Sequence, residues 1–217
     1  MNSLHHLFVT ALFLSSNVFA ADWPTWGGDA TRNMVSLETG LDFDFEPGEM
    51  NDDESVKMET TKNIKWVAKL GSQAYGNVTI ANGRVFAGTN NESPRDDGKK
   101  GDRGVVMCFN EKSGDLEWQL VIPKLGAGKV SDWEYIGVCS SPAIEGNRVY
   151  VVTNKCEVVC LDIEGFKNGN DGPFMDEANY VKPKGTQDKL NEKFDADIIW
   201  MYDMRDQLGV FPHNVTS

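Results

Sequence analysis

Residues 142–161 read PAIEGNRVYVVTNKCEVVCL, and residues 78–109 contain much of the same pattern. Matching residues lie 64 positions apart in the first half of the pattern, 52 apart in the second half and 82 apart at a closing tryptophan. The matched pairs are Ile80/Ile144, Arg84/Arg148, Val85/Val149, Phe86/Tyr150, Thr89/Thr153, Asn90/Asn154, Val106/Val158, Cys108/Cys160 and Trp118/Trp200. A constant order with changing offsets indicates an internal repeat that carries insertions of different lengths.

Each copy of the repeat contains four short runs typical of β-strands. They are Gly76–Ala81, Arg84–Asn90, Val105–Phe109 and Leu116–Ile122 in the first copy, and Val138–Ile144, Arg148–Asn154, Glu157–Asp162 and Ile198–Asp203 in the second. The turn Asn82-Gly83 lies between the first two runs, and Asn-Gly is the strongest short-range signal for a hairpin. The sequence therefore predicts an all-β fold of two four-stranded antiparallel units, at about 75–122 and 138–203. The resemblance of this repeat to a propeller family implies that the units are β-propeller blades.

Residues 63–217 are expected to form only part of a propeller. Asn63–Leu70 repeats the tryptophan strand a third time, because Trp66 lies 52 positions before Trp118. A propeller closes with about four to eight blades, whereas this chain supplies about two blades and one extra strand. Open blade faces and strand edges favour association. We therefore expect a fragment whose remaining blades lie elsewhere, in preference to a ring of identical chains.

Two polar insertions interrupt the repeat. Residues 91–103 are charged and rich in turn residues, which predicts a surface loop. Residues 163–196 form a longer polar insertion before the last strand. Loops of this length inside a compact domain are usually functional or poorly ordered, and the sequence leaves both interpretations open.

The first 20 residues have the pattern of a secretory signal peptide. An apolar run at residues 7–14 is followed by Val18-Phe19-Ala20, with small residues at both cleavage-defining positions. This pattern predicts cleavage after Ala20 or Ala21. The run is shorter than the roughly 20 apolar residues of a membrane-spanning helix. The mature chain is therefore expected in the periplasm or outside the cell, with no transmembrane span.

The composition of the chain argues against nucleic-acid binding and against two kinds of histidine-dependent site. The chain has 33 acidic and 21 basic residues, a formal net charge of −12. Nucleic-acid binding needs clustered Lys and Arg, so no nucleic-acid partner is expected. His213 is the single histidine after the expected signal peptide. That composition argues against a His-ligated zinc site or a Ser-His-Asp triad in these residues.

Residues 21–62 read as an aromatic lead-in followed by an acidic loop. Nine acidic residues lie between positions 38 and 59, with Lys57 as the one basic residue. The carboxylates of Asp42-Phe-Asp44-Phe-Glu46 are of the kind that hard cations prefer. The spacing lacks the glycine and the bidentate glutamate of an EF-hand, so we favour a solvated surface loop and assign no metal ligand.

Two segments resemble the PQQ-like β-propeller repeat. Cys108-Phe-Asn-Glu-Lys-Ser-Gly114-Asp-Leu-Glu-Trp118 has an apolar strand, a turn with a Ser-Gly pair and a closing tryptophan. Ser141–Asn154 is similar to the first and second strands of that repeat. The resemblance extends from about Asp22 to the C-terminus. The chain looks similar to exported bacterial proteins of this family, namely planctomycete PQQ-binding-like propellers and outer-membrane assembly factor-like proteins.

The resemblance implies a structural role for the repeated tryptophans. In such propellers the tryptophan docks on the neighbouring blade, which assigns that role to Trp66, Trp118 and Trp200, with Gly114 in the turn of the motif. A large apolar ring buried between sheets also contributes strongly to packing.

Three functions follow from this resemblance. The first, which we favour, is a binding or scaffold module in the cell envelope that contacts envelope proteins or the remaining blades and needs no cofactor. The second is a dehydrogenase of alcohols or sugars that depends on pyrroloquinoline quinone and calcium, since Trp23-Pro-Thr-Trp26-Gly-Gly-Asp29 resembles the lead-in of those enzymes. They typically carry an adjacent cysteine pair, whereas Cys139 is followed by Ser140. The third is a carbohydrate-binding propeller, for which an exposed Trp133 would suit stacking. We assign no catalytic or cofactor-binding residue.

The four cysteines divide into two pairs. Cys108 and Cys160 occupy equivalent positions in third strands, which favours small buried hydrophobic residues. Export permits disulfides. If the first two strands of the second blade pair about Glu145-Gly-Asn147, Cys139 lies near Asn154, and Cys156 follows just beyond. Cys139 and Cys156 are therefore the candidate disulfide.

Overall fold

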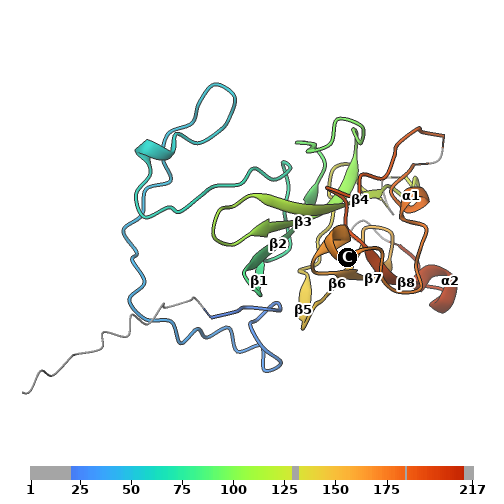
Figure 1. The fold of residues 1–217 in the computed structure, drawn as a ribbon, viewed down its shortest axis with the longest axis horizontal. Helices are drawn as coiled ribbons and strands as arrows, with labels where there is room; N and C mark the ends of the chain where they lie inside the picture. Colours follow the sequence, from blue (N-terminus) through green and yellow to red (C-terminus); the bar gives the residue numbers. More distant parts are fainter. Residues whose placement is uncertain (1–20, 129–131, 184, 213–217) are drawn as a thin grey trace, which may run out of the picture.

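A computed structural model describes residues 21–128, 132–183 and 185–212, which form two four-stranded antiparallel sheets. Sheet 1 contains β1 (Thr79–Ala81), β2 (Arg84–Asn90), β3 (Arg103–Asn110) and β4 (Leu116–Pro123). Sheet 2 contains β5 (Ala143–Glu145), β6 (Arg148–Val152), β7 (Glu157–Asp162) and β8 (Ile198–Asp203). The helical segments are η1 (Met58–Thr60), η2 (Gly165–Asn168), α1 (Glu177–Tyr180) and α2 (Met204–Leu208). The expected all-β class is confirmed, and no closed ring of blades is seen in the described residues (Figure 1).

The sequence repeat corresponds to a repeat of strand register. Each sheet has its strands in sequence order, with a row of paired residues that crosses three strands. The row is Phe86, Cys108 and Trp118 in sheet 1 and Tyr150, Cys160 and Trp200 in sheet 2. In both sheets the register shifts directly after the cysteine, which leaves one extra residue on the last strand. A β-bulge at the same place in both copies shows that the match extends to backbone detail.

The main core lies between the two sheets. Sheet 1 contributes Phe86, Val106, Cys108, Trp118, Leu120 and Ile122, and sheet 2 contributes Ile144, Val149, Val151, Val159, Leu161 and Ile198. Side chains alternate between the two faces of a strand, so each sheet presents a second face to its other side. On sheet 1 that second face forms a smaller core against Trp66, Ala68 and Leu70.

The strands differ from the expectation most at two places, and by three residues or fewer at the other strand ends. The first strand of the second copy begins at Ala143 instead of Val138. The Val138 amide donates a hydrogen bond to the Thr89 carbonyl of sheet 1 at 3.1 Å, and Pro142 has no amide hydrogen to donate. Residues 138–142 therefore cross between the sheets. Residues 63–70, expected as a strand, are not paired into a sheet, although their apolar side chains pack on sheet 1.

The two insertions contact each other along the edge of sheet 1. Lys99 places its ammonium 2.9 and 2.7 Å from the two carboxylate oxygens of Asp195, and both side chains are buried. Arg103 pairs with Asp188 at 2.5 Å. Gln119 of β4 forms a parallel bridge with Asp195, so the end of the long insertion lies beside the last strand of sheet 1. Covering an edge strand in this way blocks its pairing with other chains.

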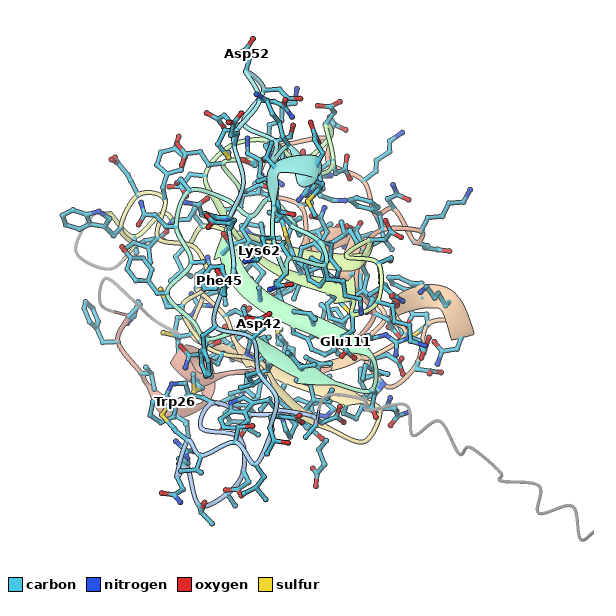
Figure 2. All side chains as sticks on the ribbon, turned by 90° about the vertical axis from the view of Figure 1, so that its left-hand side faces the viewer. Trp26, Asp42, Phe45, Asp52, Lys62 and Glu111 are labelled. Carbon is cyan, nitrogen blue, oxygen red and sulfur yellow. The ribbon has the colours of Figure 1, made fainter. Side chains whose placement is uncertain are left out.

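Residues 38–62 form a segment that we call the acidic arm, within which residues 46–62 make an antiparallel hairpin. Glu46 and Lys62 exchange two backbone hydrogen bonds of 3.0 and 3.1 Å, and Met50 bridges to Val56. The arm reaches away from the two sheets in Figure 1 and crosses in front of sheet 1 in Figure 2, where Asp52 marks its tip. The sequence predicted a solvated surface loop without its pairing, because alternating Asp and Phe residues carry no turn signal that fixes the pairing.

The expected signal peptide, residues 1–20, lies outside the described residues, as does His213. Within the part of the chain that the structure describes, no helix has both the length and the apolar character needed to cross a membrane.

Candidate binding clefts and an open sheet face

Two of the repeated tryptophans dock in the same way. The Trp118 indole, which is 1 % exposed, donates a 2.9 Å hydrogen bond to the Ile163 carbonyl just after β7 of the other sheet. The Trp66 indole donates a 2.9 Å hydrogen bond to the Glu111 carbonyl just after β3. Both bonds join residues 45 positions apart. The docking expected of Trp66 and Trp118 is therefore present, and each ring is fixed by one polar contact in addition to packing.

Gly114 lies directly beneath one of these rings. Its φ is 77°, and a Cβ at this position would stand 2.6 Å from Cδ2 of Trp66. A left-handed backbone and a contact this close both favour glycine. The glycine of the Ser-Gly pair therefore allows the Trp66 ring to pack directly on the turn.

Trp200 has a different environment. Its ring packs on Tyr150 with centroids 6.1 Å apart, but the residue remains 37 % exposed. Tyr150, Val152 and Val158 on the same side of sheet 2 are half-buried, and Tyr202 is exposed. These five residues form a sheet face that we call the open face. It corresponds strand by strand to the face of sheet 1 that is buried against sheet 2.

The register expected about the turn at residues 145–147 is present, but the pairing begins at Ala143 and Cys139 lies outside the strand. Ala143 pairs with Tyr150 and Glu145 with Arg148 about the predicted turn. Ser140, next to Cys139, donates a hydrogen bond to the Val152 carbonyl at 2.7 Å. Cys139 is half-buried, and Cys156 is buried. The disulfide between Cys139 and Cys156 stays a prediction.

Cys108 and Cys160 are both buried in the third strands, at 0 % and 1 % exposure. Burial raises the pKa of both thiols, most strongly that of Cys108. A buried thiol with a raised pKa is a poor nucleophile, in accord with a packing role.

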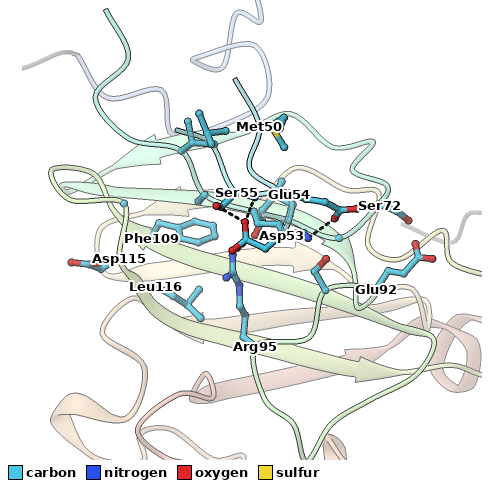
Figure 3. Close-up of a pocket in the computed structure, with 18 of the residues that line it drawn as sticks. Met50, Asp53, Glu54, Ser55, Ser72, Glu92, Arg95, Phe109, Asp115 and Leu116 are labelled. Atoms are coloured by element: carbon cyan, nitrogen blue, oxygen red, sulfur yellow. Dashed lines mark hydrogen bonds and ion pairs between the residues drawn. The ribbon is translucent and has the colours of Figure 1, made fainter. Parts of the chain in front are cut away.

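An outer cleft of about 1190 Å³ lies between sheet 1 and the acidic arm. Its apolar lining includes Met50, Val67, Leu70, Phe109 and Leu116. Figure 3 shows Phe109 and Leu116 on the sheet side, with Met50 and Ser55 on the arm that faces them. The cleft therefore combines an apolar floor with a polar wall, as in many ligand sites.

Charged side chains line the rim of the outer cleft. Lys69 pairs with Glu54 at 2.7 Å and thereby lowers the pKa of that carboxyl. Hydrogen bonds from the hydroxyl and amide of Ser55 lower the pKa of Asp53. Arg95 reaches the Lys69 carbonyl. These carboxylates stay ionised at neutral pH, so the rim can hold polar or cationic groups but offers no general base with a pKa near 7.

An inner cleft of about 670 Å³ lies beside β1 and β5, next to the aromatic lead-in. Trp23 bridges to Ile80 of β1, which fixes the lead-in along this edge. Trp26 and Tyr75 line the cleft and are 47 % and 61 % exposed. The Arg32 guanidinium lies 5.7 Å from the Trp26 ring centroid, a cation–π distance. Exposed aromatic rings beside polar groups suit a planar or sugar-like ligand.

The lead-in, whose sequence resembles that of quinone- and calcium-dependent dehydrogenases, lines the inner cleft, so its donors can be compared with the needs of calcium. Asp29 is the one carboxylate of its lining, and the Thr31 amide and hydroxyl already bond to it, which lowers its pKa. Calcium takes about six to eight oxygen ligands. In the described ranges no three acidic, histidine or cysteine side chains are placed to hold a metal ion. The donors at this cleft therefore do not fit a quinone-bound calcium, and we derive no catalytic step through it.

The other carboxylates considered from sequence lie on the surface. Asp44 pairs with Lys62, and Asp42 accepts a hydrogen bond from Asn63 at 2.6 Å.

Trp133, considered for carbohydrate stacking, is 50 % exposed and lines neither cleft.

Sequence reasoning did not locate either cleft. Tyr75 and Arg95 lie in turn-rich segments where no periodicity marks a lining residue. Tyr75 aligns with Cys139 at the repeat offset of 64, and both residues line or adjoin the inner cleft. That offset is the one signal that could have indicated a shared site. No protein-family model matches this chain, and no curated protein is significantly similar to it.

Proposed function

We propose that this chain is an exported cell-envelope binding module built from PQQ-like propeller blades. The proposal is supported by the repeat, by the indole docking of Trp66 and Trp118, and by the signal-like amino-terminal sequence. The mature protein works in the periplasm or outside the cell, and its action is binding and not catalysis.

The open face of sheet 2 is the observation that carries this proposal. Phe86 and Trp118 on the equivalent face of sheet 1 are 0 % and 1 % exposed, because sheet 2 covers them. Trp200 and Tyr202 are 37 % and 40 % exposed. Aromatic residues are enriched at the centres of protein interfaces, where they combine large contact area with a polar tip. The partner of this face is an apolar sheet surface, either of another envelope protein or of further blades.

Site-specific crosslinking from the open face tests the proposal. A photo-crosslinking residue at Tyr202 should capture one defined envelope partner, and excess unlabelled protein should compete with that capture. The Trp200→Asp protein should not compete, because an aspartate would be buried unpaired in the interface. A crosslinker at Trp133 is the matched control, since this exposed tryptophan lies outside the open face. Equal competition by wild type and Trp200→Asp would contradict the proposal.

A second binding function is favoured by the inner cleft. Trp26 and Tyr75 expose their rings beside Arg32 and Asn77, an arrangement that suits a carbohydrate. Titration with neutral oligosaccharides should quench tryptophan fluorescence in the wild type, and Trp26→Ala should abolish that quenching. Unchanged quenching in Trp26→Ala would exclude the cleft.

The dehydrogenase alternative has its own test. Incubation with pyrroloquinoline quinone and calcium should leave the protein unable to reduce an artificial electron acceptor with alcohols or sugars. Turnover that depends on the quinone would overturn the binding-module proposal and would make the chain an enzyme.

A further inference from the structure

Two acidic side chains are enclosed where the long insertion meets sheet 2. Asp197 lies immediately before β8 and is 0 % exposed. Glu177 begins α1 within the insertion and is 1 % exposed. Acidic residues are rarely buried this completely unless a counter-charge or metal accompanies them.

Both carboxylates face the same turn, and each leaves one oxygen without a partner. The Asp171 amide donates to Oδ2 of Asp197 at 2.9 Å. The side-chain amide of the preceding residue, Asn170, donates to Oε2 of Glu177 at 3.1 Å. The second oxygens, Oδ1 of Asp197 and Oε1 of Glu177, are buried and have no hydrogen-bond partner among the described residues.

Within the described ranges no basic side chain forms an ion pair with either carboxylate. Arg148 lies on β6, two strands away from β8, and it bonds to Asp162 of β7 at 2.7 Å. Burial, together with the negative charges of Glu177, Asp162 and Asp171, raises the pKa of Asp197 to about 6.

We propose that Asp197, Glu177 and the turn at residues 168–172 bind a calcium ion. The two unpartnered carboxylate oxygens are its charged ligands. Hard cations also accept amide and backbone carbonyl oxygens and water. The remaining ligands are therefore neutral oxygens of the turn, including the side-chain amide oxygen of Asn170 after rotation, and water. This site is separate from the inner cleft and does not depend on the proposed binding function.

The site would stabilise the long insertion. Residues 163–197 contact sheet 1 through Asp188 and Asp195, which pair with Arg103 and Lys99. A cation at Asp197 and Glu177 fixes the other side of the same insertion to sheet 2. Exported modules commonly bind calcium with Kd values of about 10⁻⁴ to 10⁻³ M, within reach of extracellular concentrations.

Calcium-dependent thermal unfolding of the full chain is the primary test. After EDTA treatment, Tm should rise by about 5–10 °C once free calcium reaches about 100 times its Kd. Bound Tb³⁺ should luminesce on excitation of tyrosine, because Tyr180 lies in the same short helix as Glu177. Asp197→Asn and Glu177→Gln keep the side-chain shape and should each weaken calcium affinity by at least about tenfold, or about 1.4 kcal/mol.

Matched controls separate this site from the acidic arm. Asp52→Asn, at the exposed tip of the arm, should keep the full calcium response, as should the double variant Asp42→Asn/Asp44→Asn. Without calcium, Asp197→Asn should melt at or above the wild-type Tm, because it removes an uncompensated buried charge. That result would show that loss of the calcium response is not loss of the fold.

Two outcomes would overturn the proposal. The first is a wild-type Tm that calcium does not change, with no Tb³⁺ luminescence. The second is a calcium response that persists in Asp197→Asn and Glu177→Gln, which would place the ion elsewhere.

Discussion

Sheet 1 and sheet 2 share strand order, register and a bulge at the same position, yet their equivalent faces have opposite surroundings. In sheet 1 the row through Cys108 ends in Trp118, which is enclosed by the other sheet. In sheet 2 the equivalent row through Cys160 ends in Trp200, which remains partly exposed. The difference shows that local sequence determines the sheet, whereas the neighbour of the sheet determines which face becomes core.

The comparison also locates the less stable side of the molecule. Apolar burial contributes about 25 cal/mol per Å², so a face that contacts no second layer contributes little to the free energy of unfolding. The open face is therefore available for a partner, and the covered face holds the two sheets together. The predictions below test this division.

The largest effect is expected at Trp118. Trp118→Ala should lower the free energy of unfolding by about 4–6 kcal/mol, because it removes a buried ring and leaves the Ile163 carbonyl without its donor. Trp200→Ala should cost no more than about 1.5 kcal/mol, the value of its aromatic contact with Tyr150. Urea unfolding followed by circular dichroism measures both. Equal losses would mean that Trp200 is as enclosed as Trp118.

A somewhat smaller effect is expected at the edge of sheet 1. Lys99→Met should cost about 3 kcal/mol, because it leaves the carboxylate of Asp195 buried without its cation. Lys100→Met is the matched control, since the Lys100–Asp97 pair is exposed and should contribute less than about 1 kcal/mol. A negligible loss for Lys99→Met would show that the long insertion does not stabilise sheet 1.

Gly114→Ala should cost about 1–3 kcal/mol, from left-handed strain and from contact with the Trp66 ring. Gly126→Ala is the control, because Gly126 has a φ of 70° but no atom within 4 Å of an added Cβ. The difference between the two losses isolates the Trp66 contact. If both variants lose the same free energy of unfolding, the contact between Gly114 and the Trp66 ring contributes nothing to stability.

The smallest difference between the two sheets is expected from the disulfide, because Cys139 and Cys156 both belong to the second copy. Thiol titration of the unfolded, unreduced protein should detect two of the four cysteines, and all four after reduction. Cys139→Ser should then expose the thiol of Cys156 to the reagent. Four reactive thiols before reduction would exclude the disulfide.

Most of the fold could be predicted from the repeated positions. The offsets of 64, 52 and 82 identified equivalent residues in the two copies, and the structure places them at equivalent positions of the two sheets. The strand expected at residues 63–70 was wrong, since a strand needs a hydrogen-bonding neighbour and none of the described residues provides one. The first strand of sheet 2 was predicted too long because the bond from Val138 to Thr89 of sheet 1 leaves no local signal.

The sequence by itself determined the two antiparallel sheets and their turns, with Gly114 in one of them, since these depend on backbone preference and on residues close in the chain. Only the tertiary structure decided which aromatic face is covered, where the two clefts lie, and that the buried side chains of Asp197 and Glu177 bond to the same turn. Those features depend on contacts between segments far apart in sequence, and composition gives no measure of such distances. The same aromatic residue is therefore core in one copy and surface in the other, because burial is a property of the neighbour and not of the residue.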